Sequence, residues 1–241
     1  MYTRKTYETK SGRLVEEYHS YEGRPPGWKR SPRRRATPEE MKANNLRNKK
    51  RQMKLLLMEN FSPGDYHTIL TYRRDERPED LAECKRQFGK FIRRMRDWFR
   101  KKGEKLKWIC NIECGSKGAW HIHLIINRIP GIDMQLSTLW QYGRPRNVLI
   151  QDRNGLPALA EYISKGSVDP GGNVIRGMSR SRNLKMPRSR KKKIVRWETW
   201  KNDIRIPKGF ALDKQSLQEW IGMEGYPHRE YILIRLEKRR D

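Results

Sequence analysis

Trp-His-Ile-His-Leu-Ile-Ile-Asn, residues 120–127, is the stretch on which our reading of the fold depends. Its apolar and β-branched residues indicate a β-strand. Side chains alternate along a strand, so His121 and His123 point to the same side, roughly 6–7 Å apart along the chain. Ile122 and Leu124 point to the other side and can anchor the strand in a core. Two neutral imidazoles placed in this way can bind one divalent metal ion.

An apolar segment before this strand supplies a possible third metal ligand. Residues 107–113 have the composition of a strand that ends at Glu113, and Gly115-Ser-Lys-Gly118 is typical of a turn. We therefore expect a β-hairpin over residues 107–127. A register that sets Glu113 opposite His121 puts the carboxylate on the side of the imidazoles. The predicted ligands Glu113, His121 and His123 suit Mg²⁺ or Mn²⁺ better than a structural zinc ion.

A candidate nucleophile follows about 40 residues later, in residues 156–165, which are predicted to form a helix with Pro157 in its first turn. Tyr162 and Lys165 are three residues apart and so are neighbours on one helical face. A phenol is a weak nucleophile at neutral pH, but a nearby ammonium favours its ionised form. A metal-polarised phosphodiester is a more reactive target. We therefore predict that Tyr162 is the nucleophile and that Lys165 supports it; a structural phenol is the alternative.

These motifs resemble those of a known family. Glu113, His-Ile-His (121–123) and Tyr-Ile-Ser-Lys (162–165), in this order, look like the second and third motifs of the His-hydrophobic-His (HUH) endonucleases. Residues 66–72 resemble the first motif, a Thr-rich central strand. Within this superfamily the pattern is most similar to rolling-circle replication initiator (Rep) proteins of plasmids and single-stranded DNA phages. The resemblance extends over residues 61–236 and includes two tail segments, 181–187 and 225–234.

The order and number of the motifs select a branch of this family. Conjugative relaxases place the catalytic tyrosine before the His pair, whereas Tyr162 follows it. Gly166 stands where some phage initiators carry a second tyrosine. The resemblance therefore implies a single-Tyr enzyme that nicks single-stranded origin DNA, becomes linked to the 5′ phosphate, leaves a 3′ hydroxyl as primer and later rejoins the strand. Because the chain has no Gly-x-x-x-x-Gly-Lys-Ser/Thr phosphate loop, we expect a separate host helicase as well as a host DNA polymerase.

The charge of the chain agrees with a nucleic-acid partner. The formal net charge is +27 and the pI is about 10.3, with basic residues concentrated in 24–54 and 176–205. Such basic segments usually contact phosphates without reading sequence. We expect neither membrane binding nor a small-molecule substrate. The expected DNA-binding residues are Arg33, Arg34, Arg35, Lys49, Lys50, Arg51, Arg182, Lys191, Lys192 and Lys193.

The cysteines bear on the cellular compartment. There are three, Cys84, Cys110 and Cys114, with no Cys-x-x-Cys spacing, no signal peptide and no long apolar run. This pattern favours the reducing cytoplasm of a bacterial host cell over an oxidising compartment.

The order of predicted elements gives the fold class. A strand at 66–73, a strongly amphipathic helix at 79–101, the hairpin, a helix near 133–142 and a strand near 147–150 precede the Tyr162 helix. We expect an α+β fold with a ferredoxin-like or RNA-recognition-motif-like antiparallel sheet of about five strands, flanked by helices.

Two domains are expected. Residues 1–60 would be a basic arm that is loosely ordered up to residue 36 and carries a helix over about 38–59, because Thr37-Pro-Glu-Glu40 is a helix start. Residues 61–241 would form the endonuclease domain, which includes the basic segment 176–205 and closing strands near 204–206 and 230–236.

Several alternatives stay open at this stage. His67, on the first strand, could join the metal site, but a surface or structural role is preferred. Trp120 is expected in the core. A single-Tyr HUH transposase would share the chemistry, although the long basic flanks argue against it. A non-catalytic binding protein of the RNA-recognition-motif type would carry paired aromatic residues on adjacent strands.

Overall fold

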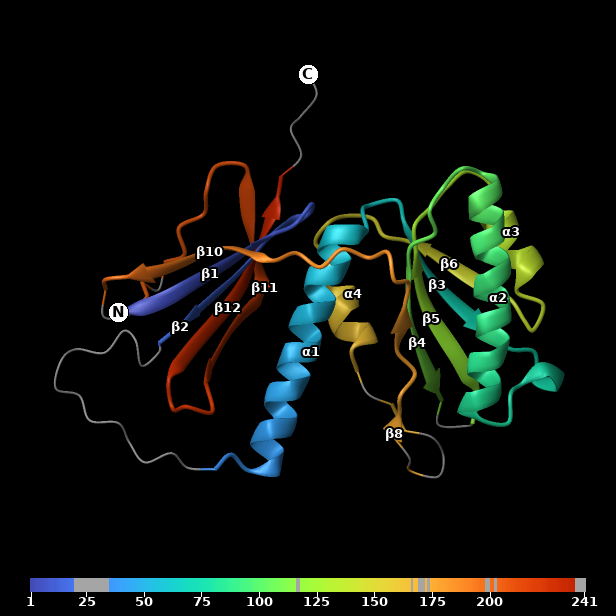
Figure 1. Ribbon diagram of the computed structural model, residues 1–241, viewed down its shortest axis with the longest axis horizontal. Helices are drawn as coiled ribbons and strands as arrows, with labels where there is room; N and C mark the ends of the chain where they lie inside the picture. The colour runs from blue at the N-terminus through green and yellow to red at the C-terminus, as the bar shows by residue number, and fades with distance from the viewer. Residues whose placement is uncertain are drawn as a thin grey trace, which may run out of the picture. The chain divides into compact units, whose positions relative to one another are not determined.

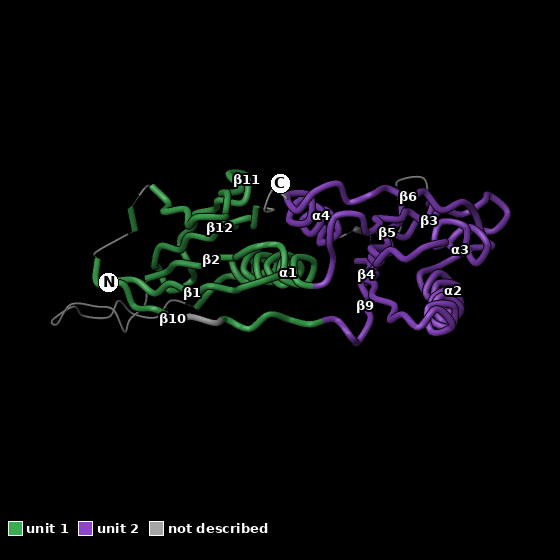
Figure 2. The backbone as a smooth tube through the Cα atoms, turned by 90° about the horizontal axis from the view of Figure 1, so that it is seen from above, with its two compact units in different colours: residues 1–59, 185–241 green, residues 60–184 purple. Residues whose placement is uncertain are grey.

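The computed structural model describes residues 1–19, 35–115, 118–165, 167–168, 172, 174–197, 200–201 and 203–236. The chain divides into two compact units (Figure 2). Unit 2 is the continuous stretch 60–184. Unit 1 combines residues 1–59 with residues 185–241, so the two ends of the chain build one unit and unit 2 is inserted between them.

Unit 2 has the expected ferredoxin-like plan. Its antiparallel sheet has the order β6-β3-β5-β4-β9 (Figure 1). The sequence order β3-α2-β4-β5-α3-β6 is the β-α-β-β-α-β arrangement. The α+β class and the open antiparallel sheet flanked by helices are confirmed. The elements are β3 (Tyr66–Thr71), α2 (Leu81–Lys101), β4 (Trp108–Cys114), β5 (Trp120–Ile126), α3 (Ile132–Leu139), β6 (Pro145–Leu149) and β9 (Ser179–Arg180).

The core of unit 2 lies between this sheet and helices α2 and α3. Helix α2 begins where the Asp80 carboxylate caps it by accepting a hydrogen bond from the Glu83 N–H at 2.8 Å. Its apolar face, which includes Phe91 and Met95, packs with one side of the sheet. Trp120 belongs to this core and is 7 % exposed, as expected. Because that side of the sheet is filled, the opposite side is left for the site.

Shorter elements complete unit 2. The 3₁₀ turn η2 (Arg74–Glu76) precedes α2, and α4 (Gly155–Ile163) follows β6. The two-residue strands β7 (Ser167–Val168) and β8 (Val174–Ile175) pair with each other.

The β4–β5 hairpin has the predicted register. Glu113 lies opposite His121, and Asn111 opposite His123. Gly118 has a φ of +71°, which suits glycine, and its N–H donates to the Gly115 carbonyl at 2.9 Å. The turn therefore sets the pairing that brings the predicted ligands together.

Unit 1 contains helix α1 and a second five-stranded antiparallel sheet, of order β10-β1-β2-β12-β11. Strand β12 pairs with β2 from His228↔Tyr18 to Ile234↔Gly12, which joins the two ends of the chain. The elements are β1 (Tyr2–Glu8), β2 (Gly12–Tyr18), α1 (Pro38–Asn60), β10 (Ser189–Val195), β11 (Phe210–Ile221) and β12 (Pro227–Arg235).

This unit differs from the expectation for the chain ends. The helix after Thr37 is present, with reciprocal hydrogen bonds between Thr37 and Glu40. Residues 2–18, expected to be loosely ordered, instead form β1 and β2. The last strands join these two rather than closing the endonuclease sheet, and the strand expected at 204–206 is replaced by β11. None of the helices in the described residues combines the length and the apolar character that a membrane span requires.

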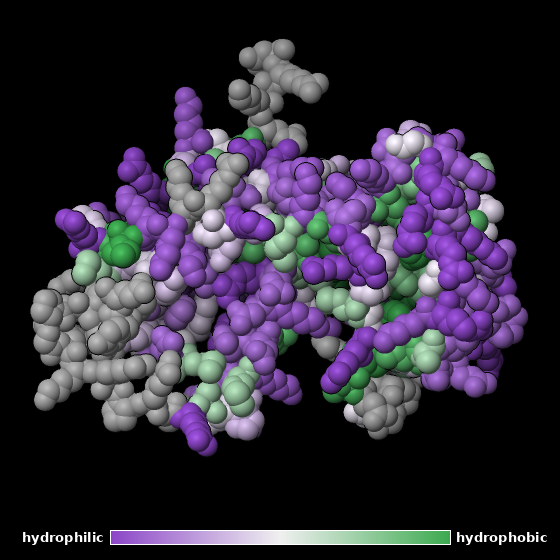
Figure 3. All heavy atoms as spheres, viewed as in Figure 1, coloured by the Kyte–Doolittle hydropathy of each residue, from purple (hydrophilic) through white to green (hydrophobic). Residues whose placement is uncertain are grey.

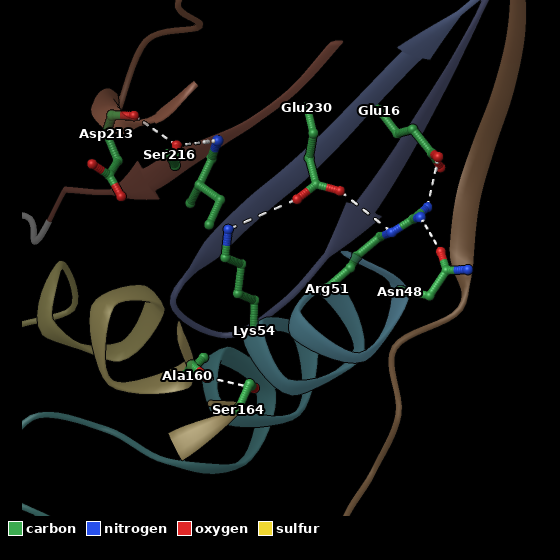
Figure 4. A network of polar contacts seen from close by, with 10 residues as sticks. Glu16, Asn48, Arg51, Lys54, Ala160, Ser164, Asp213, Ser216 and Glu230 are labelled. Carbon is green, nitrogen blue, oxygen red and sulfur yellow. Dashed lines mark hydrogen bonds and ion pairs between the residues drawn. The ribbon is translucent and has the colours of Figure 1, made fainter. Parts of the chain in front are cut away.

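Ion pairs attach α1 to the sheet of unit 1 (Figure 4). Arg51 contacts Glu16 of β2 at 2.6 Å and Glu230 of β12 at 3.3 Å. Lys54, 2 % exposed, lies 3.9 Å from Glu230. These charges are largely removed from water, so each depends on its partner for stability.

A second buried charge cluster joins three strands of the same sheet. Glu17 of β2 is fully buried and accepts hydrogen bonds from Arg4 at 2.6 Å and from the Arg229 Nε at 2.7 Å. The side chain of Arg229 is 4 % exposed. Removal of the carboxylate would leave a buried guanidinium without its counter-charge.

We therefore predict that Glu17→Gln destabilises unit 1 by about 3–5 kcal/mol, the usual cost of removing one partner of a buried ion pair. Urea unfolding followed by tryptophan fluorescence would measure the change. Glu83→Gln is the matched control, because it breaks an exposed pair with Arg86 and should hardly move the transition. An unchanged unfolding midpoint for Glu17→Gln would contradict the role of this cluster.

Candidate active site

The predicted ligands lie on the side of the unit 2 sheet opposite the core. Strand alternation and the register place Asn111 and Glu113 of β4 beside His121 and His123 of β5. The neighbouring strand β3 contributes His67, because Ile69 pairs with His123 and side chains two residues apart share a face. Three adjacent strands thus present polar groups on one surface.

Glu113, His121 and His123 form a possible metal-binding group. The Glu113 Oε2 is 3.5 Å from the His121 Nε2 and 3.6 Å from the His123 Nε2. One ligand atom from each residue lies within 4.8 Å of the others, so a single ion could contact all three. Two nitrogens and one carboxylate oxygen fit a divalent cation. The predicted cluster is therefore assembled by the fold, and its composition is compatible with Mg²⁺ or Mn²⁺.

The electrostatics of the cluster favour an ionised carboxylate. Burial would raise the pKa of Glu113, but interactions with His121 and His123 outweigh it and lower the pKa to about 2. Its carboxylate also accepts a hydrogen bond from the Asn111 side-chain amide at 2.8 Å. The interaction with Glu113 raises the pKa of His121 against the effect of burial. A negative charge is thus available to a cation across the neutral pH range.

Tyr162 reaches the same group from helix α4. Its hydroxyl lies 3.4 Å from the His123 Nε2, the nitrogen that also faces Glu113. The side chain is 42 % exposed, whereas His123 is 2 % exposed. The Lys165 Nζ is 5.7 Å from the centre of the Tyr162 ring. The structure therefore brings Tyr162 to the possible metal ligands, with an ammonium nearby.

Two further residues contact the ligands. Asn111 orients Glu113, as described above, and His67 lies beside His123, with 3.1 Å between the His67 Nε2 and the His123 Nδ1. Burial, and then His123, lower the pKa of His67 to about 4. The sequence did not single out Asn111 and favoured a surface or structural role for His67. The alternation in β3 is a signal for His67, but it becomes useful only once β3 is known to pair with β5.

The expected DNA-binding residues have different surroundings. Arg33 and Arg34 lie outside the described residues, and the side chain of Lys191 is not described. Lys50 is half-buried, and Arg51 is engaged by Glu16 and Glu230 within unit 1. The exposed members of the set are Arg35, Lys49, Arg182, Lys192 and Lys193.

The surface lacks the features of an aromatic stacking platform. At the site positions of β3, β4 and β5, the described side chains are aliphatic, polar, acidic or histidine. Paired aromatic residues on adjacent strands, which an RNA-recognition-motif binder uses, do not occur at these positions. The arrangement therefore favours metal chemistry over base stacking at this surface.

One comparison with known proteins gives a match. Residues 65–167 match the model of the family "Replication-associated protein ORF2", a family of rolling-circle replication proteins. The matched region runs from β3 to β7 and so contains the His pair, Glu113 and Tyr162. No curated protein and no solved structure matches the chain significantly. The resemblance to rolling-circle replication proteins is confirmed for the central part of the chain; the tail segments 181–187 and 225–234 lie outside the match.

The coupling between Glu113 and His121 can be tested in metal-free protein. Because the carboxylate raises the pKa of His121, Glu113→Gln should lower that pKa, leaving burial to act alone. An NMR titration of the His121 ring protons, with EDTA present, would measure the change. The resonance of His19, which belongs to unit 1, is the internal control. An unchanged His121 titration would show that the two side chains do not interact in solution.

Proposed function

We propose that this protein is a rolling-circle replication initiator that nicks and rejoins single-stranded origin DNA through a covalent 5′-phosphotyrosine intermediate. The observation that carries the proposal is the position of the Tyr162 hydroxyl, 3.4 Å from a nitrogen of the possible metal ligand His123. A phosphodiester placed at these ligands would lie next to this phenol. The match to a family of replication proteins favours replication over transposition.

Glu113, His121 and His123 would hold Mg²⁺ or Mn²⁺. When bound, such an ion polarises a non-bridging oxygen of the scissile phosphate and so makes the phosphorus more electrophilic. The hairpin supplies all three ligands from two paired strands, which keeps them in a fixed relative geometry.

Tyr162 would supply the nucleophile. Its phenolic oxygen loses its proton and attacks the phosphorus, a bond forms to the 5′ phosphate, and the bond from phosphorus to the 3′ oxygen breaks. The leaving oxygen takes up a proton and becomes the 3′ hydroxyl that a host DNA polymerase can extend. Lys165 would support the phenolate or the charge on the crowded phosphate. The reverse reaction rejoins the strand.

Affinity for DNA would come from lysine and arginine side chains outside this cluster. On the face seen in Figure 3, hydrophilic residues predominate in both units. Strand β10 lies at an edge of the unit 1 sheet, where Lys192 is directly opposite Lys5. Like charges opposite each other are unfavourable unless an anion lies nearby, so this edge suits a phosphate backbone. A host helicase would unwind the duplex, and the host cytoplasm is the proposed location.

We predict that Tyr162→Phe abolishes a covalent adduct between the protein and a single-stranded oligonucleotide, because no phenolic oxygen remains to form the phosphotyrosine. The measurement is a denaturing gel after incubation with Mn²⁺ and oligonucleotides that contain candidate origin sequences. Tyr142→Phe is the control, since this half-buried tyrosine packs against the core of unit 2. Persistence of the adduct in Tyr162→Phe would place the nucleophile elsewhere.

We also predict that binding and cleavage depend on different residues. Lys192→Ala with Lys193→Ala should weaken DNA binding and reduce the slope of log affinity against log salt by about 0.7 for each lost phosphate contact. Fluorescence anisotropy over a series of salt concentrations measures this. His121→Ala is the matched comparison, because it should keep the affinity and lose cleavage. A slope that is unchanged in the double variant would remove β10 from the DNA-binding surface.

A further inference from the structure

His67 links the central strand β3 to the buried end of the possible metal site. It lies 56 residues before His123 in the chain, yet the His67 Nε2 is 3.1 Å from the His123 Nδ1. The two rings are nearly stacked, with centroids 5.3 Å apart and an interplanar angle of 30°. Both residues come from the paired strands β3 and β5, so the sheet holds this contact in place.

The contact occupies the nitrogen of His123 that the metal would not use. The Nε2 of His123 faces Glu113 at 3.6 Å and the Tyr162 hydroxyl at 3.4 Å, whereas the Nδ1 faces His67. A neutral imidazole that binds an ion through Nε2 carries its proton on Nδ1. Because the His123 side chain is buried, that N–H needs an acceptor within the protein, which the His67 Nε2 can supply.

His67 also contacts the nucleophile. The centre of its ring is 6.1 Å from the centre of the Tyr162 ring, in an edge-to-face arrangement of 67°. Tyr162 makes a similar edge contact with His123, at 5.1 Å and 87°. One histidine on β3 therefore touches both a possible metal ligand and the tyrosine on α4.

We propose that His67 is a positioning residue that accepts a hydrogen bond from the His123 Nδ1–H and so fixes the tautomer and ring orientation in which His123 binds the metal. This inference rests on the proposed function, since it assumes that His123 is a metal ligand. His67 holds the ligand from the side opposite the ion and does not itself contact the ion.

The test measures Mn²⁺ affinity without DNA, by electron paramagnetic resonance of the free ion, for wild type, His67→Leu and His67→Gln. Leucine fills the space but accepts no hydrogen bond, whereas glutamine offers a carbonyl oxygen near the position of Nε2. We expect His67→Leu to weaken Mn²⁺ binding about 10–100-fold and His67→Gln to restore most of the loss. His19→Leu, in unit 1, is the control and should bind Mn²⁺ as wild type does.

The outcomes separate this inference from the proposed function. A role in packing alone would make leucine the better replacement, and a role as a ligand would make both variants lose affinity equally. Either result overturns the positioning role, as does an unchanged affinity in His67→Leu. In all three cases the wild type still binds Mn²⁺ and the proposed function stands. Absence of Mn²⁺ binding by the wild type would overturn both.

Discussion

The pairing of β4 with β5 is the constraint on which the site depends. Side chains on a strand change face with every residue, so a shift of the register by one would send Glu113 to the face opposite the imidazoles. The Gly115–Gly118 turn and the filled core on the other side of the sheet both work against such a shift. Ile112, Ile122 and Leu124 are buried in that core, and exposing them would cost far more than a surface change. Apolar packing on one face thus fixes the polar geometry on the other.

The part of the site that could be predicted is the part encoded by local spacing. The alternation of His121 and His123 and the short turn after Glu113 require only nearby residues, as does the spacing of Tyr162 and Lys165 on one helix. His67 could not be assigned in this way, because its contact with His123 depends on which strand pairs with β5. The approach of Tyr162 to His123 similarly depends on how α4 packs on the sheet. A family resemblance indicated that these motifs belong together, but it gave no distances between them.

The same distinction explains where the predicted and observed folds differ. Helix α2 and the hairpin could be predicted because strong periodicity or a tight turn acts within a few residues. Strands β1 and β2 could not, because Glu16, Glu17 and Arg4 look like a solvated arm until the partners are known. Those partners, Arg229 and Glu230, lie more than 200 residues away on β12. Buried ion pairs make a charged segment resemble a disordered one in composition, so only the tertiary pairing distinguishes them.

The contrast in exposure between His123 and Tyr162 follows from what each would have to do. A metal ligand gains from a buried, rigid position, since its ring must keep one orientation while the ion changes partners. A tyrosine that becomes joined to a DNA strand needs open space, because the product is a macromolecule attached to its oxygen. Helix α4 can meet this need because it is separate from the hairpin, and it carries the phenol to the edge of the buried cluster. His67, in contact with both rings, is the point at which the rigid sheet can influence the exposed nucleophile.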